Sequence, residues 1–159
     1  MTKPPAEPDV AYAPCVAVSG TMIAHFTTRL EVEADRAGGP HRERLLAVAS
    51  FIVDSYRHAP ELMKVIIVEV TRAANSFGRT HLPEIRQAYE GIAKIVSDGQ
   101  EAGAFRGDIS PLFASMTFYG AIEQLLSGWI FDLIPASDAG FDEAKELLVT
   151  TICDGLEPR

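Results

Sequence analysis

Apolar residues recur at three- and four-residue spacing through most of this 159-residue chain, and the alternating pattern of a half-buried strand is nearly absent. Spacing of this kind places apolar side chains on one side of an α-helix. With 47% hydrophobic residues, the chain can bury one ordinary core. The sequence therefore predicts an all-α fold with one main domain over 41–157, preceded by a region, 1–40, that holds a Pro-rich start and a short helix.

Glycine and proline mark the ends of the predicted helices. Gly38-Gly39-Pro40 ends the first helix, because glycine loses much backbone entropy in a helix and Pro40 disfavours helical geometry at the residue before it. Pro60 and Pro111 suit a first helical turn, and Ser110 is the predicted N-cap before Pro111. The expected helices are 18–36, 41–58, 60–77, 82–103, 110–134 and 140–156.

Two of these helices are expected to differ in burial. The 82–103 helix carries Ile85, Tyr89, Ile92 and Val96 on one side and charged residues on the other, which predicts one solvated face. The 60–77 segment is apolar nearly all round. A helix with no polar face is typically buried on all sides, so this segment is expected to be the central helix.

The 110–134 helix carries two stripes and the last helix a third. The first stripe has small or uncharged side chains: Ala114, Thr117, Ala121, Gln124, Gly128 and Phe131. The second is Met116, Tyr119, Glu123, Leu126, Ile130 and Leu133, and the third is Phe141, Ala144, Leu148, Thr151 and Ile152. We expect the first stripe, with Leu148 and Thr151, to form a homodimer interface in which two helices from each subunit make a four-helix bundle. The alternative is that these stripes are buried inside a monomer, because periodicity does not distinguish the two.

Composition limits the partners and the compartment. A formal charge of −8 repels phosphate backbones, and no local basic patch stands out to reverse this. Two cysteines, Cys15 and Cys153, in a domain of this size suggest a reducing compartment. The first fourteen residues lack the basic start and apolar run of a signal peptide, and no apolar stretch approaches the length of a membrane span. We expect a cytoplasmic protein without membrane contact.

Motifs of catalysis and metal binding are missing from the sequence. It contains no P-loop, GxGxxG, GxSxG or HExxH motif. The histidines at 25, 41, 58 and 81 are scattered, without partners at metal-ligand spacing. The sequence therefore predicts neither an enzyme nor a resident metal or cofactor.

Two long stretches carry a family resemblance. HAPELMKVIIVEVTRAANSFG (58–78) and IAKIVSDGQEAGAFRGDISPLFASMTFYGAIEQLLSGWIFDL (92–133) resemble the C-terminal regulatory domain of tetracycline-repressor-type (TetR-type) transcriptional regulators. The resemblance extends over roughly 41–157. It implies a dimerising domain that senses a small hydrophobic ligand. Within the family the chain is most similar to the branch that senses long acyl chains, often as acyl-coenzyme A.

The resemblance also implies a tunnel for an apolar ligand. Its expected lining comes from three helices: Met63, Ile66 and Val70, then Ile92 and Val96, then Met116, Tyr119 and Glu123. Glu123 would serve as a polar anchor or lie at the rim in water, and Arg72, Arg79 or Arg86 could meet a phosphate or carboxylate at the mouth. The alternative is that the apolar members are ordinary core residues.

A shorter match lies upstream. Family members end their helix-turn-helix with Gly-Thr-Leu-Tyr-x-His-Phe, and residues 20–29 here read GTMIAHFTTR, with Ile23 where the family usually has tyrosine. A three-helix DNA-binding domain needs about thirty further residues before this point, and 1–19 are too few and too Pro-rich to supply them. DNA binding and the natural status of Met1 thus stay open. The other interpretation is a ligand-binding dimer, or a partner of a complete paralogue, without DNA contact.

Overall fold

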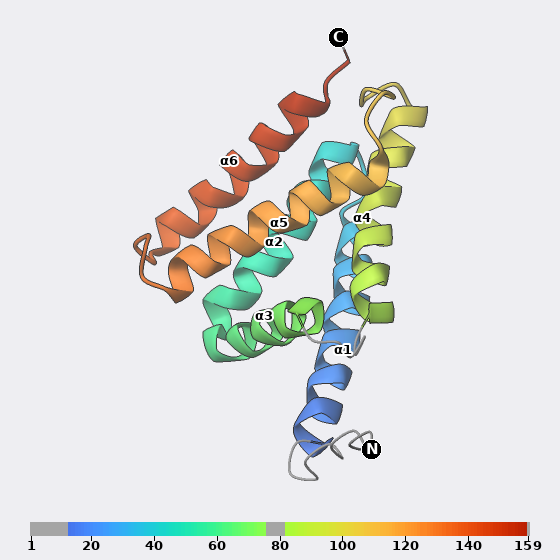
Figure 1. Cartoon of the computed structure of the whole chain (residues 1–159). Helices are drawn as coiled ribbons and strands as arrows, with labels where there is room; N and C mark the ends of the chain where they lie inside the picture. The colour runs from blue at the N-terminus through green and yellow to red at the C-terminus, as the bar shows by residue number, and fades with distance from the viewer. Residues whose placement is uncertain (1–12, 76–81, 159) are drawn as a thin grey trace, which may run out of the picture.

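A computed structural model of the chain describes the backbone of residues 13–75 and 82–158, and the side chains of 22–67 and 82–158. Within those residues the chain forms six helices and no strand (Figure 1). The expected all-α fold is confirmed. The helices are α1 (Ala13–Ala37), α2 (His41–His58), α3 (Pro60–Asn75), α4 (Leu82–Glu101), α5 (Pro111–Ile130) and α6 (Asp138–Leu156).

The predicted capping and breaking residues act as expected. Gly38 and Gly39 have φ angles of 54° and 70°, in the left-handed region that glycine adopts readily, so α1 ends there and α2 begins at His41. Ser110 caps α5, because its Oγ accepts a hydrogen bond from the Phe113 amide at 3.4 Å. Ser137 caps α6 in the same way, accepting from the Gly140 amide at 3.1 Å.

The fifth helix is shorter than its apolar pattern predicted. It ends at Ile130 and not at residue 134, because Asp132 adopts a positive φ of 54°. Asp is one of the few residues that tolerate this conformation. The Leu133 amide then donates to the carbonyl of Gly128 at 2.8 Å, which turns the chain out of the helix and toward α6.

The central helix is α2 and not, as the sequence suggested, the 60–77 segment. Figure 1 shows α2 behind α5, and it packs against each of the other helices, whereas α3 packs mainly on α1 and α2. On α3, Met63 and Ile66 are buried, but Leu62 and Val65 are each 45% exposed. The apolar character of α3 therefore comes partly from side chains outside the core.

Aromatic side chains join α2 to the pair formed by α5 and α6. Trp129 and Phe141 meet edge to face with ring centroids 4.7 Å apart, and Tyr56 lies 5.9 Å from Trp129. The guanidinium carbon of Arg57 lies 5.2 Å from the centre of the Phe141 ring, within the range of a cation–π contact. Because α5 and α6 run antiparallel side by side, this cluster anchors both helices on α2 (Figure 1).

The segment that resembles the end of a helix-turn-helix lies inside α1. Residues 20–29 are part of one continuous helix. Within them Ile23 and Thr27 are buried, and the Phe26 ring packs on Phe51 of α2 with centroids 5.1 Å apart. Ile23, Phe26 and Thr27 of this segment are thus part of the packing of α1 on the other helices.

Candidate ligand groove and dimer face

The main candidate site is an open groove of about 850 Å³ between α1, α2 and α3. A groove of this size suits a small organic molecule. Its described lining is mostly apolar: Met22, Phe26, Ala47, Phe51, Ala59, Leu62, Met63 and Ile66. The polar members are His25, Arg29, Glu33, Ser50, Asp54, Ser55 and His58.

Each charged side chain of the groove has a partner. Arg29 donates to Glu33 on the next turn of α1 at 3.2 Å. On α2, both carboxylate oxygens of Asp54 accept from Lys145 of α6, at 3.0 and 3.2 Å. The Nδ1 atom of His58 lies 2.7 Å from the Asp54 carbonyl oxygen, and because a carbonyl only accepts, Nδ1 carries the proton.

A second, much smaller cavity lies deeper, between α1, α3, α4 and α5. It has a volume of about 20 Å³, room for one water molecule, and is lined by Ile66, Tyr89 and Tyr119 among others. The two tyrosine rings meet edge to face at 5.4 Å. Burial raises the pKa of the Tyr119 phenol well above its usual range, and the nearby Glu123 carboxylate raises it further. The phenol therefore stays protonated at neutral pH.

Part of the predicted ligand lining lies at these two sites. Met63 and Ile66 line the groove, and Ile66 meets Tyr119 at the smaller cavity. Glu123 is partly buried one turn after Tyr119. The side chain of Val70 lies outside the described residues.

The rest of the predicted lining lies elsewhere. Ile92 and Val96 are core residues with 0 and 1% exposure and line neither cavity. Met116 is 53% exposed and lines a separate open groove of about 1090 Å³ between α4 and α5. The eight residues are therefore not brought together in one tunnel.

The groove residues that sequence reasoning missed come from α1 and α2. His25, Arg29 and Glu33 follow one another at four-residue spacing, which places them on one face of α1. Phe51 and Asp54 are neighbours on the facing side of α2. The four-residue spacing of these three polar side chains was the available signal.

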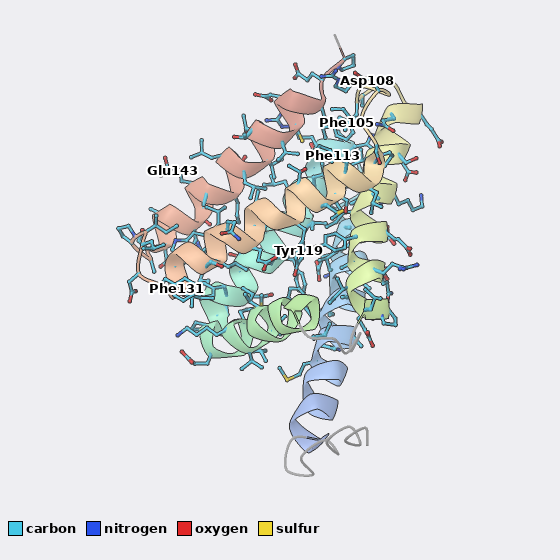
Figure 2. The ribbon with its side chains drawn as sticks, viewed as in Figure 1. Phe105, Asp108, Phe113, Tyr119, Phe131 and Glu143 are labelled. Carbon is cyan, nitrogen blue, oxygen red and sulfur yellow. The ribbon has the colours of Figure 1, made fainter. Side chains whose placement is uncertain are left out.

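The predicted interface residues divide into three groups. Those exposed to solvent are Thr117, Gln124, Phe131 and Thr151; Ala121 and Gly128 are partly buried; Ala114 and Leu148 are buried in the protomer's own core. Two large apolar side chains beside the predicted stripes are exposed instead, Phe113 at 66% and Leu147 at 58%. Phe113 and Phe131 lie at opposite ends of α5 (Figure 2). Thr117, Gln124 and Phe131 of the predicted stripe are thus exposed together with Phe113, and on α6 Thr151 is exposed together with Leu147.

Comparison with protein families gives a match over residues 42–152 to the family described as "Tetracyclin repressor-like, C-terminal domain". The chain belongs to this family. The match spans α2 to α6 almost completely, so it includes the α2 and α3 walls of the groove and both helices of the exposed face. Domains of this TetR-type family are ligand-binding and dimerisation domains of transcriptional regulators.

The TetR-type domain also has a similar solved structure, entitled "Structure of a protein with unknown function from Rhodococcus sp. RHA1". The two share 17% sequence identity and superpose with a TM-score of 0.75 over 90% of this chain and 73% of the other. This likeness supports the fold alone. No curated protein matches the sequence.

Two further kinds of site are absent from the described part of this TetR-type domain. No three His, Cys, Asp or Glu side chains in that part are grouped so that they could hold a metal ion. None of its helices combines the length and the apolar character needed to cross a bilayer.

Proposed function

We propose that this chain is the ligand-sensing, dimerising domain of a cytoplasmic TetR-type transcriptional regulator, and that a small hydrophobic effector binds in the groove between α1, α2 and α3. The observation that carries the proposal is the open, mostly apolar groove of about 850 Å³ built largely on the family-matched helices. Met63 in its wall is a flexible side chain that adapts to ligands of different shape.

The proposed signalling partner is a second copy of the chain. Phe113, Phe131 and Leu147 expose apolar surface on α5 and α6, the two helices that lie side by side at one side of the domain. Two such pairs would pack as a four-helix bundle. An effector that favours one arrangement of the groove helices would then shift the population of the dimer between two states.

An acyl chain is one tail that would fit the apolar floor formed by Phe51, Leu62 and Ile66. The coenzyme A part of an acyl-CoA is less well matched. The only arginine among the described lining residues is Arg29, which already pairs with Glu33. The proposed effector is therefore a small hydrophobic molecule without a coenzyme A group.

The groove proposal is tested with decanol, an uncharged apolar probe. Isothermal titration calorimetry should detect decanol binding to the native protein and not to Leu62→Asp, because that change puts a charge in the groove. Leu62 is 45% exposed, so the change should leave the fold intact. Val32→Asp is the matched control, since Val32 is 50% exposed on α1 and does not line the groove. Equal binding by Leu62→Asp and Val32→Asp would refute the groove as the site.

A second candidate function is a ligand-binding dimer without DNA contact of its own. Two observations favour it: the formal charge of −8, and the packing of Phe26 on Phe51 within the segment that resembles a helix-turn-helix end. Electrophoretic mobility shift with the promoter DNA beside its own gene decides between the two. Salt-dependent, nanomolar binding would exclude this second candidate.

A further inference from the structure

Three carboxylates share two cations where α2 meets the start of α6. Arg57 pairs with Asp142 at 2.8 Å, with Asp54 at 3.4 Å and with Asp138 at 3.4 Å. Lys145 pairs with Asp142 at 2.9 Å and with Asp54 at 3.0 Å. The cluster of five therefore carries one negative charge in excess, as formal charges at neutral pH.

Asp54 is the member of this cluster that lines the groove. Asp138 and Asp142 have side-chain exposures of 89% and 63%, so their charges are screened by water. Asp54 is only 34% exposed and is one of the residues that line the mostly apolar groove. A charge near apolar walls interacts more strongly with a counter-ion than a fully solvated charge does.

A cation that reaches Asp54 from the groove leaves no other group unpaired. Lys145 keeps Asp142, and Arg57 keeps both Asp142 and Asp138. The ion pairs around Asp54 thus allow exchange, with the incoming cation replacing Lys145 as the partner of the Asp54 carboxylate.

The other polar side chains of the groove include hydrogen-bond acceptors. Glu33 provides a second carboxylate. His58 donates from Nδ1, so Nε2 of the neutral ring is an acceptor. The paired rings of Phe26 and Phe51 also line the groove and offer π faces or edges beside Asp54. The one arginine among the described lining residues, Arg29, pairs with Glu33.

We propose that the groove selects an apolar amine, bound as its ammonium ion, with Asp54 as the counter-ion and the apolar tail along Leu62, Met63 and Ile66. This inference rests on the proposed function and adds to it the chemical class of the effector. It also gives the effector a direct competitor on α6, because the ammonium and Lys145 both require the Asp54 carboxylate.

Three probes with the same tail and different heads test the proposal: decylammonium, decanol and decanoate, each titrated below its micelle concentration by isothermal titration calorimetry. We expect decylammonium to bind the native protein about tenfold more tightly than decanol, the size of one charge-assisted hydrogen bond. Decanoate is expected to bind more weakly than decanol. Decanoate or decanol binding as tightly as decylammonium would overturn the proposal.

Two variants of the same ion pair give opposite expected results. Asp54→Asn removes the counter-ion and should lower decylammonium affinity about tenfold, with decanol affinity unchanged. Lys145→Met removes the competitor and should raise decylammonium affinity. Both variants break the contact between α2 and α6, so a merely structural effect would change the affinity in the same direction in both. A change of decylammonium affinity in the same direction in both variants would overturn the proposal.

Glu101→Gln is the control for overall charge, because Glu101 is an exposed acid at the end of α4 that lines neither groove. It should leave all three affinities unchanged. The titrations distinguish failure of the amine proposal from failure of the groove proposal. Binding of decanol without preference for decylammonium contradicts the amine proposal and leaves the groove intact, whereas binding of none of the three probes contradicts the groove as well.

Discussion

The ring of Phe105 lies against the backbone of Gly99, in the space that a side chain at residue 99 would fill. A Cβ on Gly99 would come within 2.8 Å of Cε2 of that ring. Phe105 is 6% exposed, and its amide donates to the Gly99 carbonyl at 3.0 Å, so the ring has little room to withdraw. The turn that follows α4 therefore requires glycine at this position.

Gly99→Ala is expected to lower the free energy of unfolding by about 1–3 kcal/mol, the usual cost of overpacking a core. Gly91→Ala is the control in the same helix, because its Cβ would make only an ordinary contact, 3.6 Å from the Glu31 side chain. That change should raise stability by about 0.5–1 kcal/mol through helix propensity. Urea denaturation of both variants decides, and a stable Gly99→Ala would contradict the packing described.

Gln100 holds the connection between α4 and α5. Its Nε2 donates to the carbonyl of Arg106 at 2.8 Å and to that of Ile109 at 2.7 Å. Gln100→Ala leaves both partly buried acceptors without this donor and should cost about 1–3 kcal/mol of unfolding free energy. Gln87→Ala should cost less, because Gln87 is exposed and bonds only to the Glu31 side chain. Equal costs in urea denaturation would argue against the role of Gln100.

Dimerisation is predicted to depend on the exposed face of α5 and α6. Light scattering at micromolar concentration should give a dimer for the native chain. Phe113→Asp and Leu147→Asp should shift it to monomer, because each would place a charge in the proposed apolar interface. Val32→Asp, an equally exposed apolar position on α1, should remain dimeric. A monomeric native protein would refute the proposed bundle.

Ionisation of the buried Cys153 thiol is predicted to lower the stability of the fold at alkaline pH. Burial raises the pKa of its thiol from 9.0 to about 11, with smaller opposing and reinforcing effects from Arg42 and from Asp154 and Glu157. Between about pH 9 and pH 11 the folded protein thus keeps the thiol proton, whereas the unfolded chain loses it. The associated stability is complete below about pH 9 and is lost toward pH 11, by about 2–3 kcal/mol.

The comparison that isolates this thiol is between the native chain and Cys153→Ala. Both retain Tyr89 and Tyr119, whose pKa values are also raised by burial and which add to the loss of stability at high pH. Urea unfolding between pH 8 and pH 11 should therefore show a steeper decline for the native chain. Parallel curves would rule out a contribution from Cys153.

Helix ends were predictable where local chemistry alone decides them. The glycine pair before Pro40, together with Pro60, predicted a helix over 41–58, and α2 has these bounds. Asp132 was not predictable as an end of α5, because Asp adopts positive φ only when the following turn stabilises it. The turn depends on hydrogen bonds to Gly128 that the sequence pattern does not reveal.

The arrangement of the helices was less predictable. A periodicity argument treats every apolar side chain as buried. Leu62, however, contributes to the wall of an open groove, so the apolar pattern of α3 wrongly indicated a central helix. On α5 the predicted stripe includes exposed Thr117 and Gln124, but periodicity did not separate exposed Phe113 from its buried neighbour Ala114, because adjacent side chains differ by about 100° around the helix axis. The groove was not predicted because α1 forms one of its walls, and periodicity does not show which helices α1 packs against.

The central place of α2 also determines how the domain should open. Because α2 packs against every other helix, the amide hydrogens of its middle turns should exchange with solvent only when the whole domain unfolds. The amides of α3, which packs mainly on α1 and α2, should exchange through a local detachment. Hydrogen exchange should thus distinguish α2, a permanent wall of the groove, from α3, a wall that can detach locally and so change the shape of the groove.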